Sequence, residues 1–94
     1  MSVRRSKLDI MLSVLSTVKE GVDKPTRIMY ATNVSWNSLQ EVLSGLVRQE
    51  LLREIEVPRN KRSRRRYEVT EKGVNVLAYF EGASEILDIE KVVI

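Results

Sequence analysis

A dense run of cationic side chains lies in the middle of this chain. Six of the eight residues between positions 59 and 66 are basic: Arg59, Lys61, Arg62, Arg64, Arg65 and Arg66. Guanidinium and ammonium groups form charge-assisted hydrogen bonds with phosphate oxygens, and a block of like charges is stable only when it is solvated or neutralised. The run therefore predicts either a solvated loop or an arm that binds a polyanion. We favour the arm, because the flanking segments supply the rest of a nucleic-acid-binding module.

The charge is unevenly distributed along the chain. Residues 1–66 carry 14 basic and 7 acidic side chains, whereas residues 67–94 carry 2 basic and 6 acidic ones. The net charge of +3 therefore understates the positive field of the first part of the chain. We expect one end of the molecule to face a negatively charged partner and the other end to lie away from it.

The composition excludes several kinds of chemistry. The 94 residues include no cysteine and no histidine, which removes zinc-finger ligands, disulfides, thiol nucleophiles and imidazole acid–base pairs. We find no nucleophile–base pair and no metal cluster, and we expect no enzyme activity, no cofactor and no small-molecule ligand. No apolar stretch approaches the ~20 residues that cross a bilayer, and the first residues lack the apolar core of a secretory signal. The expected location is the cytoplasm, in association with the nucleoid.

A first helix is predicted over residues 6–20. Its apolar residues recur at steps of three and four, with Ser6 available as N-cap and Gly21 as the stop. Ile10 and Val14 widen the apolar stripe, so we expect this helix to be covered on more than one side and to be central to the core.

A second, shorter helix is predicted to begin at Pro25, because proline is tolerated in a first turn where its missing donor would be unpaired anyway. Three of its residues are expected to face inward: Ile28, Met29 and Tyr30. Thr32 and Asn33 then favour a tight turn.

A third helix is predicted from Trp36 to about Gln49, with Ser35 as its cap. The residues of its apolar stripe are Leu39, Val42, Leu43 and Leu46. The polar residues of its opposite face are Asn37, Gln40, Glu41, Ser44 and Arg48. Gly45 is unfavourable inside a helix by ~1 kcal/mol relative to alanine, so we interpret it as a site where another helix approaches closely.

A two-stranded hairpin and a fourth helix complete the chain. The alternation over residues 52–57 and the short segment 67–69 predict two strands on either side of the cationic run, with Pro58 and Asn60 at the end of the first. Thr70 is a suitable N-cap for the last helix. The predicted fold class is therefore α+β and mainly α.

The order of these elements is that of a winged helix-turn-helix domain, in which the third helix enters a major groove and the hairpin, or wing, contacts flanking backbone. Three blocks carry a closer resemblance: SKLDIMLSVL at residues 6–15, KPTRIMYATNVSWNSLQEVLSGLVRQELL at 24–52 and YEVTEKGVNVL at 67–77. They resemble the small archaeal winged helix-turn-helix DNA-binding proteins, including the ten-kilodalton chromatin-associated class of thermophilic crenarchaea.

The resemblance implies a dimeric protein that binds double-stranded DNA. Residues 1–70 would form the winged-helix DNA-binding part, and residues 71–94 a C-terminal helix that pairs two subunits as an antiparallel coil after the motif Thr70-Glu71-Lys72-Gly73. Two features depart from the family pattern. Glu50 replaces the glycine that usually ends the third helix, and residues 71–90 would span only about 30 Å.

Residues at the start of the third helix are the candidates for reading DNA bases. Short amide and hydroxyl side chains pair with base edges in the major groove, which here means Asn37, Ser38, Gln40 and, further along, Ser44. Two readings of Trp36 stay open: a core residue, or an indole resting on the sugar–phosphate backbone with its N–H donating to phosphate. Backbone amides beside Ser35 are a further candidate for binding a phosphate.

The cationic residues are the candidates for phosphate contacts. Arg59, Lys61 and Arg62 lie nearest the wing tip and are the strongest, whereas Arg64 and Arg66 share one side of a strand and Arg65 takes the other. The other candidates are Arg27 in the second helix and a basic group before the first helix, which is either a tail or a phosphate clamp: Arg4, Arg5 and Lys7.

The last helix offers more apolar surface than the core of one subunit needs. The predicted dimer residues are Val76, Tyr79, Phe80, Ala83, Ile86 and Leu87. The alternative is that this helix folds back on the first helix of its own chain. Our leading hypothesis is a homodimeric transcription regulator; the alternatives are a sequence-nonspecific chromatin protein and a winged-helix module for protein interactions.

Overall fold

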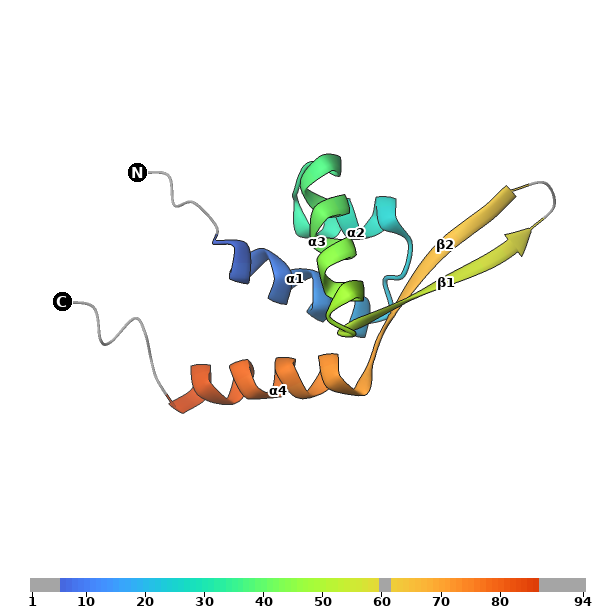
Figure 1. The fold of residues 1–94 in the computed structure, drawn as a ribbon. Coiled ribbons are helices and arrows are strands. Elements are labelled where there is room, and N and C mark those ends of the chain that lie inside the picture. The colour runs from blue at the N-terminus through green and yellow to red at the C-terminus, as the bar shows by residue number, and fades with distance from the viewer. Residues whose placement is uncertain (1–5, 60–61, 87–94) are drawn as a thin grey trace.

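The computed structural model describes residues 6–59 and 62–86. Three helices, α1 (Lys7–Lys19), α2 (Pro25–Thr32) and α3 (Trp36–Arg48), precede the strands β1 (Leu52–Arg59) and β2 (Arg62–Val69) and the last helix α4 (Glu71–Ile86). Figure 1 shows that α1, α2 and α3 form a body from which the hairpin extends on one side, while α4 runs beneath α1 toward the other. The fold class and the order of the elements agree with the sequence prediction.

Helix α1 begins with a reciprocal cap. The Ser6 hydroxyl accepts from the Asp9 N–H at 3.0 Å, and the Ser6 N–H donates to the Asp9 carboxylate at 3.2 Å. Val14 and Leu15 are fully buried, but in the first half of the helix Leu8 is 46% exposed and Met11 only partly buried. The prediction that α1 is central to the core therefore applies fully to its second half, whereas in the first half Ile10, Met11 and Leu12 pack against the core only partly buried and Leu8 is exposed.

Helix α2 begins at Pro25 as predicted and ends at Thr32, with Asn33 in the left-handed conformation at φ 55°. The prediction for Tyr30 was wrong, because its side chain is 79% exposed. Ile28 and Thr32 are four residues apart and face the core together, so Tyr30, about 200° around the helix from Ile28, must face solvent.

Helix α3 has the predicted inner face and a cap that uses Ser35, whose hydroxyl accepts from the Ser38 N–H at 3.2 Å. All four residues of the apolar stripe are buried: Leu39, Val42, Leu43 and Leu46. The interpretation of Gly45 was wrong, because a β-carbon placed there would have no neighbour within 4 Å. This glycine marks an open surface rather than a close helix contact.

The strands of the hairpin are longer than predicted. They pair antiparallel from Leu52 opposite Val69 to Arg59 opposite Arg62, so most of the cationic run is part of β2 and not of a loop. Strand geometry separates consecutive arginines onto opposite faces, which reduces their mutual repulsion. Pro58 lies inside β1, as is tolerated in a strand with a free edge. At the base of the hairpin the Tyr67 N–H donates to the Asp23 carbonyl at 3.1 Å and ties β2 to the α1–α2 connection.

A compact junction joins the end of α3, the hairpin and the start of α4. Glu50 takes the left-handed conformation, φ 63°, that the family's usual glycine at this position would adopt without strain. The Thr70 hydroxyl donates to the Glu50 carbonyl at 2.7 Å and accepts from the Gly73 N–H at 3.0 Å, which confirms Thr70 as the cap of α4. Lys72 donates to the Gln49 carbonyl at 2.9 Å.

Helix α4 is anchored to the body through one side. Leu77 is buried in the core and Val76 packs against it, whereas Tyr79 on the opposite side is 73% exposed. Within the part of the chain that the structure describes, no helix is long and apolar enough to span a bilayer.

Candidate nucleic-acid interface

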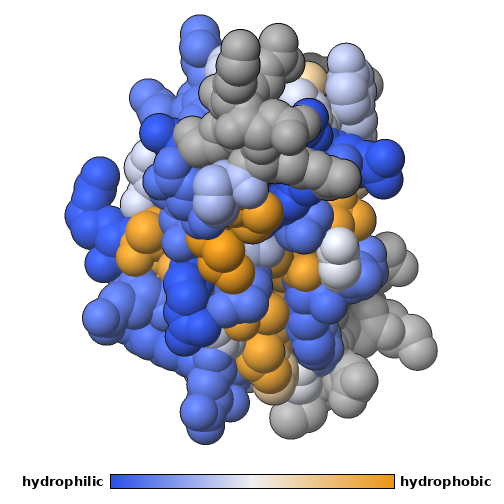
Figure 2. Space-filling view, turned by 90° about the vertical axis from the view of Figure 1, so that its right-hand side faces the viewer, coloured by the Kyte–Doolittle hydropathy of each residue, from blue (hydrophilic) through white to orange (hydrophobic). Residues whose placement is uncertain are grey.

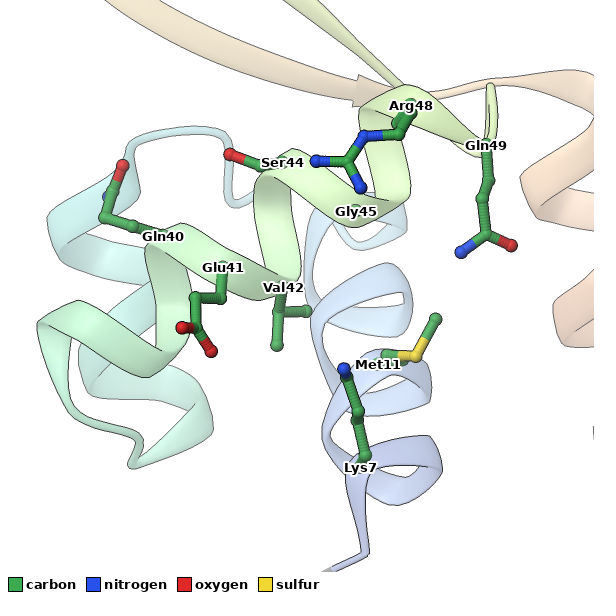
Figure 3. Close-up of a pocket in the computed structure, with 9 residues that line it drawn as sticks. All are labelled: Lys7, Met11, Gln40, Glu41, Val42, Ser44, Gly45, Arg48 and Gln49. Carbon is green, nitrogen blue, oxygen red and sulfur yellow. The ribbon is translucent and has the colours of Figure 1, made fainter.

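The outer face of α3 is polar and accessible. Asn37, Glu41, Ser44 and Arg48 are exposed and Gln40 is half-buried. Figure 3 shows the last four of these side chains on α3, beside a shallow groove of about 580 Å³ whose other wall carries Lys7 and Met11 of α1. These amide, hydroxyl and charged groups are free to meet a ligand along most of the length of the helix.

The start of α3 presents a set of small hydrogen-bonding groups. The Ser35 hydroxyl accepts the Ser38 N–H and donates to the Ser38 hydroxyl at 2.9 Å, so these two candidate residues hold each other in place. Asn37 between them is exposed, and its side chain makes no hydrogen bond within the described residues. No acidic residue occupies the first turn, so the positive end of the helix is not neutralised locally.

Trp36 lies where α3 meets the wing. Its side chain is 46% exposed and lines an open cleft of about 240 Å³. The other residues of this cleft come from the start of α2 and from β2: Lys24, Pro25, Thr26, Arg64, Arg65 and Arg66. This exposure is against a core position for Trp36, and its contact with the sugar–phosphate backbone stays a prediction. Sequence reasoning missed Lys24 and Thr26, which the fold brings beside the arginines.

The wing has two different faces. By the strand register, Arg53, Ile55 and Val57 of β1 share a face with Glu68, Arg66 and Arg64 of β2. Glu54 and Glu56 share the other face with Tyr67 and Arg65. The predicted separation of Arg64 and Arg66 from Arg65 agrees with this register. The acidic residues of β1 make the second face much less positive than the first.

Ion pairs occupy several of the wing arginines. Arg53 lies 2.6 Å from Glu68, Arg65 lies 3.3 Å from Glu54, and the half-buried Arg66 lies 3.9 Å from Asp23. Arg64 is exposed and takes part in none of the ion pairs within residues 6–59 and 62–86. Solvent screens such exposed pairs, so they stabilise the wing little but keep these arginines in defined places.

The base of the wing is fixed by Tyr67, which is buried in the core. Burial raises the pKa of its hydroxyl above the usual 10.0, the Glu54 carboxylate raises it further, and Arg65 opposes the shift. The hydroxyl therefore stays neutral at physiological pH, and Tyr67 serves as an anchor rather than as a charged group.

The remaining candidate residues either lie away from the cleft or are not fully described by the structure. Lys7 at the start of α1 and Arg27 on α2 are exposed, and neither adjoins the cleft around Trp36. The following lie outside the described residues: Arg4, Arg5, Lys61 and Leu87. For Arg59, Arg62 and Ile86 only the backbone is described.

The side of the molecule from which the wing extends is mainly hydrophilic. Figure 2 shows this side, where hydrophilic residues surround a narrower group of hydrophobic ones near its centre. Val57 of the wing is 38% exposed and is one apolar residue accessible to a ligand. The surface thus combines cationic, polar and limited apolar contacts.

Comparisons with known proteins agree with this architecture. Residues 4–88 match the family described as winged helix-turn-helix. Over 85 residues the chain is 26% identical to the uncharacterized protein MJ0287 of Methanocaldococcus jannaschii, covering 90% of this chain and 79% of that protein. The archaeal, winged-helix resemblance predicted from the sequence is thereby confirmed.

Two solved structures have the same fold. The structure of smu.1704 from Streptococcus mutans UA159 matches with a TM-score of 0.78 and 20% identity, covering 92% of this chain and 85% of that one. A PadR family transcription regulator from Clostridium difficile R20291 matches with a TM-score of 0.76 and 15% identity, covering 88% and 92%. At these identities the likeness shows the fold alone.

Proposed function

Since the chain belongs to the winged helix-turn-helix family, we propose that it binds double-stranded DNA and acts as a homodimeric transcription regulator. In this proposal α3 enters the major groove, where Asn37, Ser38 and Gln40 meet base edges. The wing arginines contact flanking backbone or enter the adjacent minor groove. One observation carries the proposal: the start of α3, at Trp36, and the cationic strand β2 line one open cleft.

The similar structures support this proposal without deciding it. One of them is described as a transcription regulator of the PadR family, and it shares this fold with a TM-score of 0.76. A shared fold does not fix a function, so the argument depends on the surface chemistry of this chain. That surface provides polar side chains on α3, the helix that would enter the major groove, and cationic side chains of the wing beside it.

The homodimer is proposed from the uncovered apolar surfaces. Tyr79 and Phe80 on α4 form an edge-to-face pair with ring centroids 5.4 Å apart, yet Tyr79 is 73% exposed. Ala83 on α4 and Leu8 on α1 are also exposed. A second copy that covers α4 and the first half of α1 would bury this surface. It would also place two α3 helices on one face of a duplex, where major grooves recur every ~34 Å.

A sequence-nonspecific chromatin protein is the second candidate function. The density of arginine and lysine in residues 59–66 favours it, because contacts to phosphates give affinity without sequence preference. A regulator should prefer its operator over random duplex by ~10³ or more, whereas a chromatin protein binds both with nearly equal affinity.

The test is binding to duplex DNA at about 150 mM salt, near the physiological ionic strength. A gel shift with random duplex should show binding, and selection from a random library should return one short inverted repeat. Replacing Asn37 or Gln40 by alanine should change the recovered motif while leaving affinity for random duplex nearly unchanged. Recovery of no motif would favour the chromatin role. A protein that leaves all duplexes unshifted would favour a module for protein interactions.

A further inference from the structure

We infer that the cleft at the base of the wing holds the sugar–phosphate backbone of one DNA strand, with Trp36 against the deoxyribose and Lys24 and Arg64 on phosphates. This inference rests on the proposed function and adds to it the site of backbone contact. It places a main contact beside the start of α3, whereas the sequence pattern favoured the wing tip.

The lining of the cleft has the chemistry of a backbone site. Of its seven residues four are cationic, one is the tryptophan and none is acidic. Its volume of about 240 Å³ lies below the range usual for pockets that enclose a small molecule, roughly 300–1,000 Å³. An open, cationic cleft of this size suits a strand that passes through it better than a free nucleotide that must be enclosed.

Arg64 is the arginine of the cleft that is free to bind. Arg65 is held by Glu54 at 3.3 Å, and Arg66 is held by Asp23 at 3.9 Å with only 19% of its side chain exposed. Arg64 has no such partner within the described residues, so binding a phosphate requires no ion pair to be broken first. Lys24 lies across the cleft on the α2 side and gives a second cation for the same strand.

Trp36 supplies the apolar part of the site. The buried face of α3 does not need Trp36, because Leu39, Leu43 and Leu46 on the same helix are almost fully buried. A half-exposed indole beside cations offers an apolar ring to the sugar and an N–H to a phosphate oxygen. This explains why a large aromatic residue stands at a surface position of the first turn.

The first test places a negative charge in the cleft. Thr26 is exposed and lies in the first turn of α2, where a carboxylate stabilises a helix. Thr26→Glu should therefore fold normally and yet weaken binding to a fluorescein-labelled random duplex by about tenfold, since charge-assisted contacts are each of that order. Thr26→Gln is the matched control of similar size, and it should bind like the parent protein.

The second test compares two arginines on the same face of the wing. Arg64→Gln should weaken binding by about tenfold. Arg53→Gln removes the same charge outside the cleft, from a residue already paired with Glu68, and should have a much smaller effect. Circular dichroism of each variant shows whether its fold is intact.

The third measurement uses Trp36 as the only tryptophan of the chain. Its fluorescence should change on adding the unlabelled duplex, with the same midpoint as the anisotropy of the labelled duplex. Deoxyadenosine monophosphate should produce no such change, and a response to this nucleotide in place of DNA would overturn the inference.

Failure of the inference differs from failure of the proposed function. If the parent protein does not bind duplex DNA at all, the proposed function is wrong. If the parent binds but Thr26→Glu equals Thr26→Gln, Arg64→Gln equals Arg53→Gln and Trp36 emission is unchanged, then the protein binds DNA elsewhere and the cleft assignment is wrong.

Discussion

The wing and helix α4 both extend from the same three-helix body, but the side chains on their surfaces differ in chemistry. The wing carries arginines on both strands, and short ion pairs across the strands join Arg53 to Glu68 and Arg65 to Glu54. Helix α4 carries the exposed Tyr79, which contacts the half-buried Phe80 edge to face, and the chain from residue 67 onward has three times as many acidic as basic residues. Fixed positive charge suits a polyanion, and exposed aromatic area suits another protein surface. The difference indicates that the two extensions serve two different partners.

The largest effect on stability is expected when substitutions on the two sides of α4 are compared. Leu77 is buried in the core, so Leu77→Ala should lower the free energy of unfolding by about 2–5 kcal/mol. Tyr79 faces outward, so Tyr79→Ala should change the stability of the subunit by less than about 0.5 kcal/mol and instead shift the protein toward monomers. Urea unfolding at fixed protein concentration measures the first, and sedimentation equilibrium the second. A Tyr79→Ala protein that remains as dimeric as the parent would remove α4 from the interface.

A large effect on binding alone is expected from the wing tip. Changing Arg59, Lys61 and Arg62 to glutamine should weaken binding to every sequence and lower the logarithmic salt slope by up to about 2.7, at ~0.9 per lost phosphate contact. Dimerisation should be unaffected, since the wing and α4 are separate extensions. Salt titrations of affinity from about 50 to 200 mM check this, and an unchanged slope would show that the wing tip makes no phosphate contact.

Much of the fold could be predicted because local signals agreed with one another. Ser6, Pro25, Ser35 and Thr70 mark the starts of helices through hydrogen bonds or restricted backbone angles that involve neighbours in sequence. Apolar spacing then identified the buried face of α3, since a helix of fixed period can bury only one stripe. These signals act over a few residues and do not depend on the rest of the chain.

The failures arose where distant residues decide the outcome. Helix α1 was predicted to be covered on more than one side, but nothing in its own sequence tells that Leu8 at its start is left exposed. The second strand was predicted over residues 67–69 alone, but pairing with β1 extends it back to Arg62. The cleft around Trp36 joins residues 24–26, 36 and 64–66, so no short segment of sequence could have revealed it.

A moderate loss of stability is expected at the junction where both extensions meet the body. A β-carbon on Gly73 would collide with the Leu51 carbonyl oxygen and lie 2.6 Å from the Val69 Cγ2. Gly73→Ala should therefore lower the free energy of unfolding by about 1–3 kcal/mol, as overpacked sites do. Thermal unfolding followed by circular dichroism gives the value. If the variant were as stable as the parent, α4 would not be held against the hairpin as closely as the structure has it.

The smallest expected effect is a gain in the free energy of unfolding. It comes from a second glycine-to-alanine substitution, in α3. Gly45 is helical, and a β-carbon there would have no neighbour within 4 Å. Gly45→Ala should therefore raise the free energy of unfolding by about 0.5–1 kcal/mol, because alanine loses less conformational freedom in a helix. The same unfolding measurement, run beside Gly73→Ala, tests both signs at once. A destabilised Gly45→Ala would indicate that another group packs on the groove between α1 and α3 and that this surface is not open.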